Sequence, residues 1–420
     1  MRVLFVAPYV PSRIRVRSYH LLLGLAQRGH TVSLVAPARG QADMEALAAL
    51  RPFCEQIVAV PQGPATSLLA YLRAARGPLP LQAAHTLSAA MLAALRHTLQ
   101  RPFDLLHVEH LRAAEPVLAT AAALGGAPPL VYDSVDCISL LFERALRASP
   151  SLSTRALALL ELARTRRYEV RCLEHFQQVL ATSSEDARAL EILGSCYGRR
   201  ALAPVAVVPN GVDLAHFAPA GESGEPATVL LSGKMSYHAN QAAARFLLRR
   251  IMPLVWRARP TTRVLIVGAH PPAWLRAYAD PRVMVTGYVP AMPAMMARAT
   301  LAVCPLLYGV GVQNKVLEAM AMGKPVVASR QASVALAAQP GAELLVAESA
   351  EEFATALLAL LADPARRRAL GAGGRCYVER EHSWEASVAR LERRYAAALQ
   401  PDAPAVNSLS AVPQVDLERC

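Results

Sequence analysis

The sequence has few aromatic residues and no long uninterrupted apolar stretch. Aromatic residues make up 5% of the 420 residues and apolar residues 54%, so a core must be built largely from Ala, Leu and Val. Charged residues are 18%, which together with the apolar content excludes a disordered chain. No run of about 20 apolar residues occurs, which argues against a membrane-spanning helix. The nearest candidate, 116–132, is interrupted by a Gly pair and a Pro pair.

Paired cysteines are also missing. The seven cysteines are odd in number and none are spaced as Cys-x-x-Cys, so the sequence predicts neither a disulfide framework nor a zinc site. A reducing cytoplasm fits this pattern. Residues 1–10 read as a strand rather than as a basic and apolar leader, so we expect no secretion. The expected location is therefore cytoplasmic, and a peripheral position at the inner face of the membrane stays open.

Lysine is scarce in a chain that is otherwise strongly basic. The net charge of +12 favours anionic partners such as nucleotides, phospholipid head groups or nucleic acid. Only three of the 44 cationic residues are lysines, namely Lys234, Lys315 and Lys324. Each is a candidate functional residue, although compositional drift explains them equally well. Arginines and leucines alternate in 155–171, which indicates a solvated helix face or a helix resting on anionic lipid.

Short apolar runs alternate with longer stretches rich in Ala, Leu and Arg, which is typical of βα units around a parallel sheet. In the first half we expect strands at 2–7, 31–36, 56–60, 104–108, 130–133 and 178–181, and helices such as 18–27, 88–99 and 154–175. In the second half we expect strands at 228–231, 263–267, 282–286, 301–305, 325–328 and 344–347, and helices at 240–257, 313–322, 350–361 and 364–380.

The two halves meet at residues 208–213, which read VPNGVD and indicate a turn or hinge. We therefore expect an α/β chain with two doubly wound, Rossmann-like parallel-sheet domains, 1–200 and 201–382, facing across a cleft. A helix at 383–400 would pack back towards the first domain, and 401–420 would form a disordered tail.

The loop best suited to bind an anion begins at Gly309 and enters a helix that ends at Gly323. Its glycines let a phosphate approach the backbone, and the first-turn amides of the helix favour negative charge. Lys315 lies in that first turn, where a cation is unfavourable unless an anion is bound. Glu318 lies near the face of Lys315 and could accept two hydroxyl hydrogens from a ribose. A surface ion pair between Lys315 and Glu318 explains the pattern equally well.

Residues 318–325 read EAMAMGKP and resemble the signature of GT-B glycosyltransferases of family GT4, in which Glu-x7-Glu precedes Ala-x-Ala-x-Gly-x-Pro. Residues 313–321, QNKVLEAMA, resemble the sugar transferases associated with bacterial exopolysaccharide and exosortase loci. Further resemblance lies in FVAPYVP at 5–11, RSYH at 17–20, GHTV at 29–32, VPNGVD at 208–213 and HSW at 382–384. The first Glu of the signature falls at Val310, which leaves the donor sugar open.

The resemblance implies a retaining, metal-independent transfer from a nucleotide diphosphate sugar to a carbohydrate or lipid-linked acceptor, in exopolysaccharide biosynthesis and without a cofactor. The donor would be bound by Gly311, Val312, Gln313, Asn314, Lys315, Glu318 and Tyr288. Lys234, in the loop 232–240, would reach the donor diphosphate, or it is an exposed loop lysine without a role. In the same loop we interpret His238 as incidental and Asn240 as a helix N-cap.

On the first domain, Arg13, Arg15 and Arg17 open a helix after the first strand. They could meet an anionic acceptor or the departing phosphate, or they form a solvated helix start. His110, also assigned to the acceptor side, and Asp136 follow two further strands. Asp136 could accept the proton of the acceptor hydroxyl, or it caps the next helix. His107 and His110 lie close together in the sequence, but no third metal ligand accompanies them, so no metal site is predicted.

Three other functions stay open at this point. A sugar-nucleotide epimerase or hydrolase of the same fold would consume the donor without an acceptor. A dinucleotide-dependent oxidoreductase is disfavoured because no Gly-x-Gly-x-x-Gly follows the first strand. A nucleic-acid-binding or scaffold protein would use the positive charge, but the arginines are dispersed and no reading helix is visible, so no nucleic-acid partner is expected.

Overall fold

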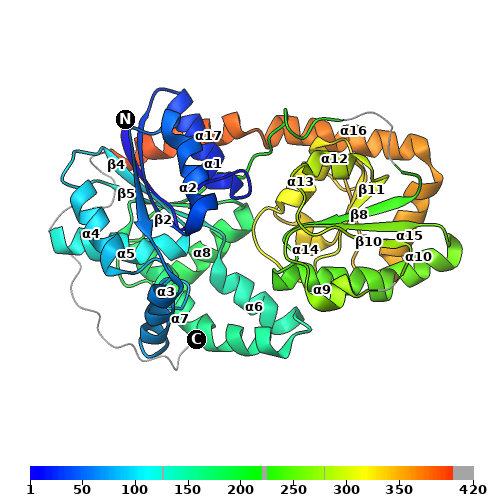
Figure 1. Ribbon diagram of the computed structural model, residues 1–420, viewed down its shortest axis with the longest axis horizontal. Helices are drawn as coiled ribbons and strands as arrows, with labels where there is room; N and C mark the ends of the chain where they lie inside the picture. Colours follow the sequence, from blue (N-terminus) through cyan, green and yellow to red (C-terminus); the bar gives the residue numbers. More distant parts are fainter. Residues whose placement is uncertain (125–126, 220–224, 279, 401–420) are drawn as a thin grey trace. The chain divides into compact units, whose positions relative to one another are not determined.

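The computed structural model describes residues 1–124, 127–219, 225–278 and 280–400. The chain divides into two compact units (Figure 1). Unit 1 comprises Met1–Leu140, Leu159–Val208 and Ser387–Cys420, and unit 2 comprises Leu141–Ala158 and Pro209–Ala386. The tail expected at 401–420 lies outside the described residues.

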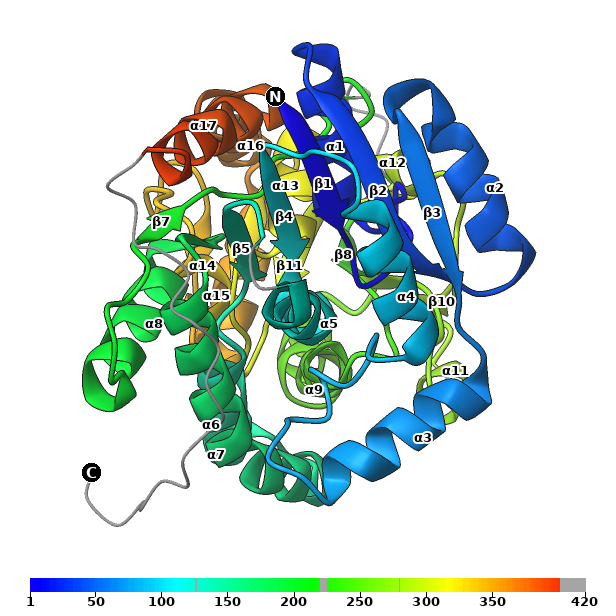
Figure 2. The same ribbon diagram turned by 90° about the vertical axis from the view of Figure 1, so that its left-hand side faces the viewer.

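Unit 1 contains a seven-stranded parallel sheet in the order β3-β2-β1-β4-β5-β6-β7, which crosses Figure 2 from right to left. The strands are β1 (Arg2–Val6), β2 (Thr31–Ala38), β3 (Gln56–Pro61), β4 (Leu105–Glu109), β5 (Leu130–Val135), β6 (Gln178–Ala181) and β7 (Val205–Val207). The six strands expected from the sequence are confirmed to within two residues at each end. The short β7 was not expected, because its three residues run directly into the VPNGVD turn and were interpreted as part of the boundary between the two halves.

Helices cover both faces of this sheet. The helices that belong mainly to this unit are α1 (Val16–Gln27), α2 (Gly40–Leu50), the short η1 (Arg51–Phe53), α3 (Pro64–Ala75), α4 (Ala89–Thr98), α5 (His110–Leu124), α7 (Leu152–His175), α8 (Ser184–Tyr197) and α17 (Trp384–Ala398). Most of α6 (Ile138–Ala148) belongs to unit 2. On β1, Leu4 and Val6 point into a core shared with α4, α5 and α7. Phe5 points to the opposite face, where it stacks on His107, and His107 in turn contacts Tyr395 of α17. Alternation along one strand thus supplies two cores, as a doubly wound sheet requires.

Unit 2 contains a six-stranded parallel sheet in the order β10-β9-β8-β11-β12-β13. Its strands are β8 (Thr228–Ser232), β9 (Arg263–Val267), β10 (Val283–Val285), β11 (Leu301–Cys304), β12 (Val326–Ala328) and β13 (Leu345–Val346). Its helices are α9 (His238–Phe246), the π-helical η2 (Leu247–Ile251), α10 (Met252–Ala258), α11 (Ala273–Arg276), α12 (Met292–Ala297), α13 (Asn314–Ala321), α14 (Arg330–Ser333), α15 (Ala350–Ala362) and α16 (Pro364–Glu381).

The two faces of the unit 2 sheet are again covered separately. Val229 and Leu231 of β8 pack into a core with η2, α10 and α15, whereas Leu230 packs with residues around α12. The helix expected at 240–257 is divided into α9, η2 and α10, since Pro253 has no N–H to continue the helical ladder. Across the described parts of both units, no helix is long and apolar enough to cross a membrane.

Candidate functional site

The predicted anion loop of unit 2 leads from β11 into α13 and keeps the first turn of that helix open. Gly311 has φ 67°, in the left-handed region that favours glycine. Gln313 occupies the N-cap, but its side chain donates to the Val310 carbonyl oxygen at 3.0 Å and does not accept from the helix. Because no side chain caps this helix, the first-turn amides can receive an anion. Val312 is buried beside this turn, and Asn314 begins the helix.

Lys315 meets the loop that follows β8. A Cβ built on Gly233, where φ is +136°, would lie 3.4 Å from Lys315 Nζ and 3.0 Å from Asn240 Nδ2. The Lys315 ammonium donates to Asn240 Oδ1, and Asn240 Nδ2 donates to the Lys234 carbonyl oxygen at 2.9 Å. Asn240 therefore joins the two lysine-bearing segments. The N-cap interpretation of Asn240 is wrong, because α9 begins at His238 with Tyr237 at its N-cap.

Loops after three neighbouring strands converge at this edge of the unit 2 sheet. Gly268, after β9, approaches the β8 loop so closely that a Cβ there would lie 1.8 Å from the Gly233 carbonyl oxygen. The Gly268 amide also donates to the Gly287 carbonyl oxygen at 3.0 Å, which brings in the loop after β10. Tyr288, next in that loop, is 63% exposed. Ligands of open parallel sheets bind at this kind of edge.

The Glu318 carboxylate is half-buried and unpartnered. Within the described chain, no donor hydrogen-bonds to its oxygens. Burial raises the pKa of Glu318 to about 7, although the Lys315 ammonium acts in the opposite direction. The oxygens of this half-buried carboxylate can accept hydrogen bonds from a ligand, and two ribose hydroxyls are suitable donors.

The three lysines have different surroundings. Lys234 is exposed, and no other side chain of the described residues contacts its ammonium. Lys324 instead anchors the chain, since its Nζ donates to the carbonyl oxygens of Ala297 at 2.9 Å and Ala299 at 2.7 Å. Burial lowers the pKa of Lys324. Two of the lysines, Lys234 and Lys315, are thus associated with the anion loop, and the third is structural.

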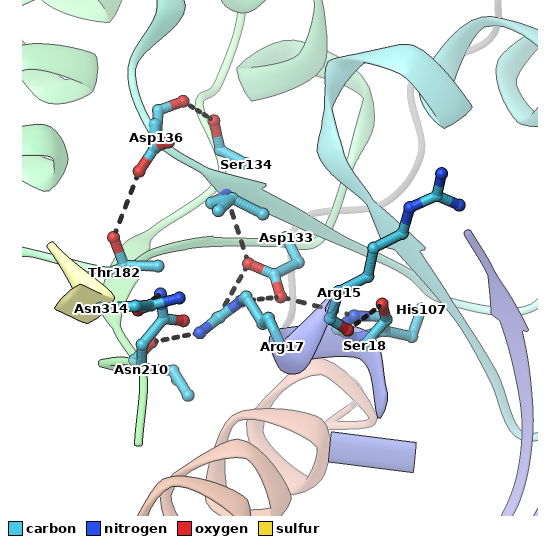
Figure 3. Close-up of polar contacts among 12 residues, drawn as sticks. Arg15, Arg17, Ser18, His107, Asp133, Ser134, Asp136, Thr182, Asn210 and Asn314 are labelled. Carbon is cyan, nitrogen blue, oxygen red and sulfur yellow. Dashed lines mark hydrogen bonds and ion pairs between the residues drawn. The ribbon is translucent and has the colours of Figure 1, made fainter. Parts of the chain in front are cut away.

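Three further contacts were not foreseen from the sequence. Asn210, in the VPNGVD turn, donates from Nδ2 to Asn314 Oδ1 at 3.1 Å and so holds the first residue of α13 (Figure 3). His382 Nδ1 donates to the Asn210 carbonyl oxygen at 2.8 Å. His238, interpreted as incidental, stacks on Tyr308, with Nδ1 2.8 Å from the hydroxyl. The VPNGVD and HSW motifs were visible in the sequence, but their partners were not.

In unit 1, Arg17 and Asp133 form a buried ion pair (Figure 3). Arg17 donates from Nε and Nη2 to the two carboxylate oxygens at 2.7 and 2.9 Å, and from Nη1 to the Val208 carbonyl oxygen at 3.0 Å. Burial alone would raise the pKa of Asp133, but Arg17 and His107 lower it to about 2. Arg17, predicted on the acceptor side, is thus buried inside unit 1, where its guanidinium is bonded to Asp133 and holds that carboxylate in place.

Asp136 follows β5 in a strained turn. Val135 has φ 65°, which is unusual for a β-branched residue, and the pairing of β5 with β6 shifts register at this point. Thr182 donates to Asp136 Oδ1 at 3.4 Å (Figure 3). Burial and the neighbouring Asp186 raise the pKa of Asp136 to about 7. Such a carboxyl group suits proton transfer near neutral pH, and backbone strain is commonly retained at functional sites.

The remaining predicted acceptor-side residues lie around the first strands of unit 1. Arg13 is exposed, whereas Arg15 is half-buried with its guanidinium 4.0 Å from the Tyr9 ring centroid. His110 begins α5 with φ 64°, and its Nδ1 accepts from the Arg112 amide at 3.2 Å. Burial lowers the pKa of His110 well below its usual value.

Solved structures with this fold define the class. Sucrose-phosphate synthase from Thermosynechococcus elongatus matches with a TM-score of 0.70 and 17% identity, over 94% of this chain and 99% of that one. Anabaena HepE in complex with UDP-glucose matches with a TM-score of 0.64 and 15% identity, over 94% of this chain and 100% of that one. The protein therefore has the GT-B fold of glycosyltransferases, as the sequence predicted.

Family comparisons narrow this class. The family described as Glycosyltransferase Family 4 matches residues 14–216, and Glycosyl transferases group 1 matches residues 226–363. The chain belongs to the group 1 glycosyltransferases of family GT4. The GDP-mannose-dependent monoacylated alpha-(1-6)-phosphatidylinositol monomannoside mannosyltransferase of Corynebacterium glutamicum is 31% identical over 215 residues, which are 44% of this chain and 54% of that protein. The chain spans about half the length of the curated relatives it matches.

Proposed function

We propose that this protein transfers a sugar, with retention of configuration and without a metal, from a nucleoside diphosphate sugar to a carbohydrate or lipid-linked acceptor. One observation carries the proposal, namely the convergence of Lys315, Gly233 and the unpartnered Glu318 carboxylate at the open first turn of α13. This arrangement offers cations and amides for a diphosphate beside a carboxylate for a ribose. Family membership supports the same reading.

The proposed chemistry breaks the bond between the anomeric carbon and the diphosphate oxygen, and forms a bond between that carbon and the acceptor oxygen, which gives up its proton. Negative charge then grows on the departing diphosphate, where Lys234, Lys315 and the amides of 311–314 would stabilise it. Groups fixed in place before the reaction stabilise such charge without reorganising. Glu318 would accept hydrogen bonds from the ribose hydroxyls, and Tyr288 would lie beside the base. Backbone and cation contacts with a diphosphate do not select a base, so the proposal names none.

In unit 1 we assign proton transfer from the acceptor hydroxyl to Asp136. Its raised pKa of about 7 allows it to hold and release a proton near neutral pH. Arg13, Arg15 and His110 are assigned to the acceptor side. Arg17 would act through Asp133, because its guanidinium is committed to that carboxylate. A role in bacterial exopolysaccharide synthesis rests on the sequence resemblance of 313–321, and a position at the inner face of the membrane rests on the arginine-rich stretch 155–171.

Thermal unfolding of the full chain with UDP, GDP and ADP tests the donor site. A nucleotide at 100 times its Kd stabilises the folded state by about 2.7 kcal/mol, so one of the three should raise the melting temperature. The gain should shrink in Glu318→Gln and persist in Glu343→Gln, a control carboxylate of unit 2 away from the anion loop. If no nucleotide shifts unfolding, the proposal is contradicted. Nucleotide release that needs no acceptor would favour a hydrolase instead.

A further inference from the structure

Loops after four neighbouring strands of unit 1 gather cationic and aromatic side chains at one place. Tyr9 follows β1, and Arg15 lies 4.0 Å over its ring. Arg112, in the first turn of α5 after β4, donates from Nη1 to the Tyr9 hydroxyl at 2.6 Å. Arg39, between β2 and α2, adds positive charge at the same place. Burial, and after it the positive charge of these arginines, lowers the pKa of His85 to about 4. We call Tyr9, Arg15, Arg112 and His85 the cationic cluster.

The charge of this cluster is not neutralised within the described chain. Arg15 and Arg112 donate to the neutral oxygens of Val10 and Tyr9, and neither forms an ion pair there. Asp43 and Glu109 are the carboxylates whose charge acts on Arg15, and burial outweighs both, so the pKa of Arg15 is lowered. Asp43 accepts from the Arg39 amide at 2.7 Å, and burial raises the pKa of Glu109 to about 7. Two half-buried guanidinium groups without an anion are a suitable receptor for a phosphate.

Buried polar atoms at the cluster also lack partners. His85 is 7% exposed, its Nδ1 lies 2.7 Å from the Tyr71 hydroxyl, and its Nε2 has no hydrogen-bond partner. Gln62, after β3, donates to the His85 carbonyl oxygen at 2.5 Å, while its own Oε1 is unpartnered. Unpaired buried polar groups are rare in folded proteins and commonly mark a ligand or a bound water.

An apolar cavity adjoins the cluster. It has a volume of about 330 Å³ and is lined by residues of α3, of the segment that follows it and of the start of α4, among them Leu69, Ala74, Leu79, Ala84 and Leu87. Ala84 precedes His85 in the chain, and Tyr71 of α3 hydrogen-bonds to His85. The cavity and the cluster thus share the 84–85 segment, and the volume is in the range of small-molecule sites.

We propose that unit 1 binds an acceptor that joins a lipid phosphate to the hydroxyl group that receives the sugar, with its phosphate at Arg15 and Arg112 and the adjoining hydrocarbon chain in the apolar cavity. This inference rests on the proposed function, since it specifies the acceptor of that reaction. A neutral carbohydrate would use neither the arginines nor the cavity, and a free phosphate would leave the cavity empty. A lipid phosphate would use both the arginines and the cavity, because its charged phosphate is joined directly to an apolar chain.

Calorimetric titration of the full chain with farnesyl phosphate, farnesol and inorganic phosphate separates the two halves of the site. Farnesyl phosphate should bind at least ten-fold more tightly than either of the others. Arg112→Gln should weaken farnesyl phosphate binding at least ten-fold, and Arg112→Lys should weaken it less. Arg188→Gln, which removes an exposed cation of α8 outside the cluster, should have no effect. Leu69→Asp should weaken binding, whereas Leu68→Asp should not. Leu68 is equally exposed on α3 but does not line the cavity.

Equal binding of farnesol and farnesyl phosphate, or equal binding of inorganic phosphate, would overturn the proposal, and so would full affinity in Arg112→Gln. Nucleotide binding by unit 2, measured on the same preparations, separates this inference from the proposed function. If a nucleotide binds and farnesyl phosphate does not, the lipid acceptor is refuted and the donor site stands. If farnesyl phosphate binds and no nucleotide does, the lipid site stands and the transferase proposal fails.

Discussion

Replacing Glu318 by Gln should stabilise the ligand-free protein while weakening its hold on a nucleotide. In the native state the Glu318 carboxyl has its pKa raised from the usual 4.5 to about 7, chiefly by burial. One pKa unit corresponds to about 1.36 kcal/mol, so ionised Glu318 costs the native state up to about 3 kcal/mol. Gln has nearly the same shape and carries no charge, so it avoids this cost. Removal of a strained functional group commonly stabilises a protein in this way.

The sign of the pH dependence follows from proton linkage. Between about pH 4.5 and 7 native Glu318 holds a proton that the unfolded chain has released, so this group makes stability fall as the pH rises through that window. At pH 4.5 the variant and the wild type should therefore be equally stable. At pH 8 the variant should be more stable by up to about 3 kcal/mol, or about 6–12 °C in melting temperature for a unit of this size.

Thermal unfolding followed by circular dichroism at pH 4.5, 6 and 8 measures the difference, and titration with the nucleotide that binds the wild type measures the loss of affinity. Ribose hydroxyls donate to the ionised carboxylate, so wild-type affinity should rise as the pH increases from 6 to 8, whereas Glu318→Gln should show no such rise. A variant that is less stable at pH 8, or that binds the nucleotide as tightly as the wild type, would refute the reasoning.

Four further substitutions test other parts of the structure. Lys315→Met should weaken nucleoside diphosphate binding at least ten-fold by calorimetry, whereas Lys324→Met should lower the melting temperature and leave affinity unchanged, since Lys324 only anchors two carbonyl groups. Arg17→Ala should destabilise the protein by about 3–5 kcal/mol in urea at pH 7, because Asp133 would remain buried without its partner. Asp136→Asn should lower kcat about 10²–10⁴-fold and abolish a rise in kcat towards pH 7.

Most strands were predictable because parallel strands buried on both faces form short continuous apolar runs, and each of the twelve expected runs contains a strand. The exceptions have local causes. Strand β7 is only three residues long, and its apolar run continues directly into the VPNGVD turn, so it was interpreted as part of that turn. The break of the helix expected at 240–257 comes from Pro253.

Most of the candidate donor residues lie in one contiguous motif, 311–318, whereas the surroundings of each acceptor-side residue could not be read from the sequence. Arg13, Arg15 and Arg17 have the same side chain in one loop, yet one is exposed, one stacks on Tyr9 and one is buried. Arg17 is buried because it pairs with Asp133, which is 116 residues away in the sequence. Partners at such separations leave no local pattern. Asn240 was misread for the same reason, since its partner Lys315 is 75 residues away.

The buried Val310 explains how the anion loop keeps its shape without the first carboxylate of the family signature. Val310 is 9% exposed, so it contributes packing and no charge. The neighbouring backbone is instead held through its carbonyl groups, with Arg144 donating to the Gly309 oxygen at 2.7 Å and Gln313 donating to the Val310 oxygen at 3.0 Å. Because these bonds use carbonyl oxygens, they do not occupy the amides at the start of α13. Under the proposed function, donor binding would depend on these backbone amides and on Lys315, which would bind a diphosphate whatever the sugar attached to it.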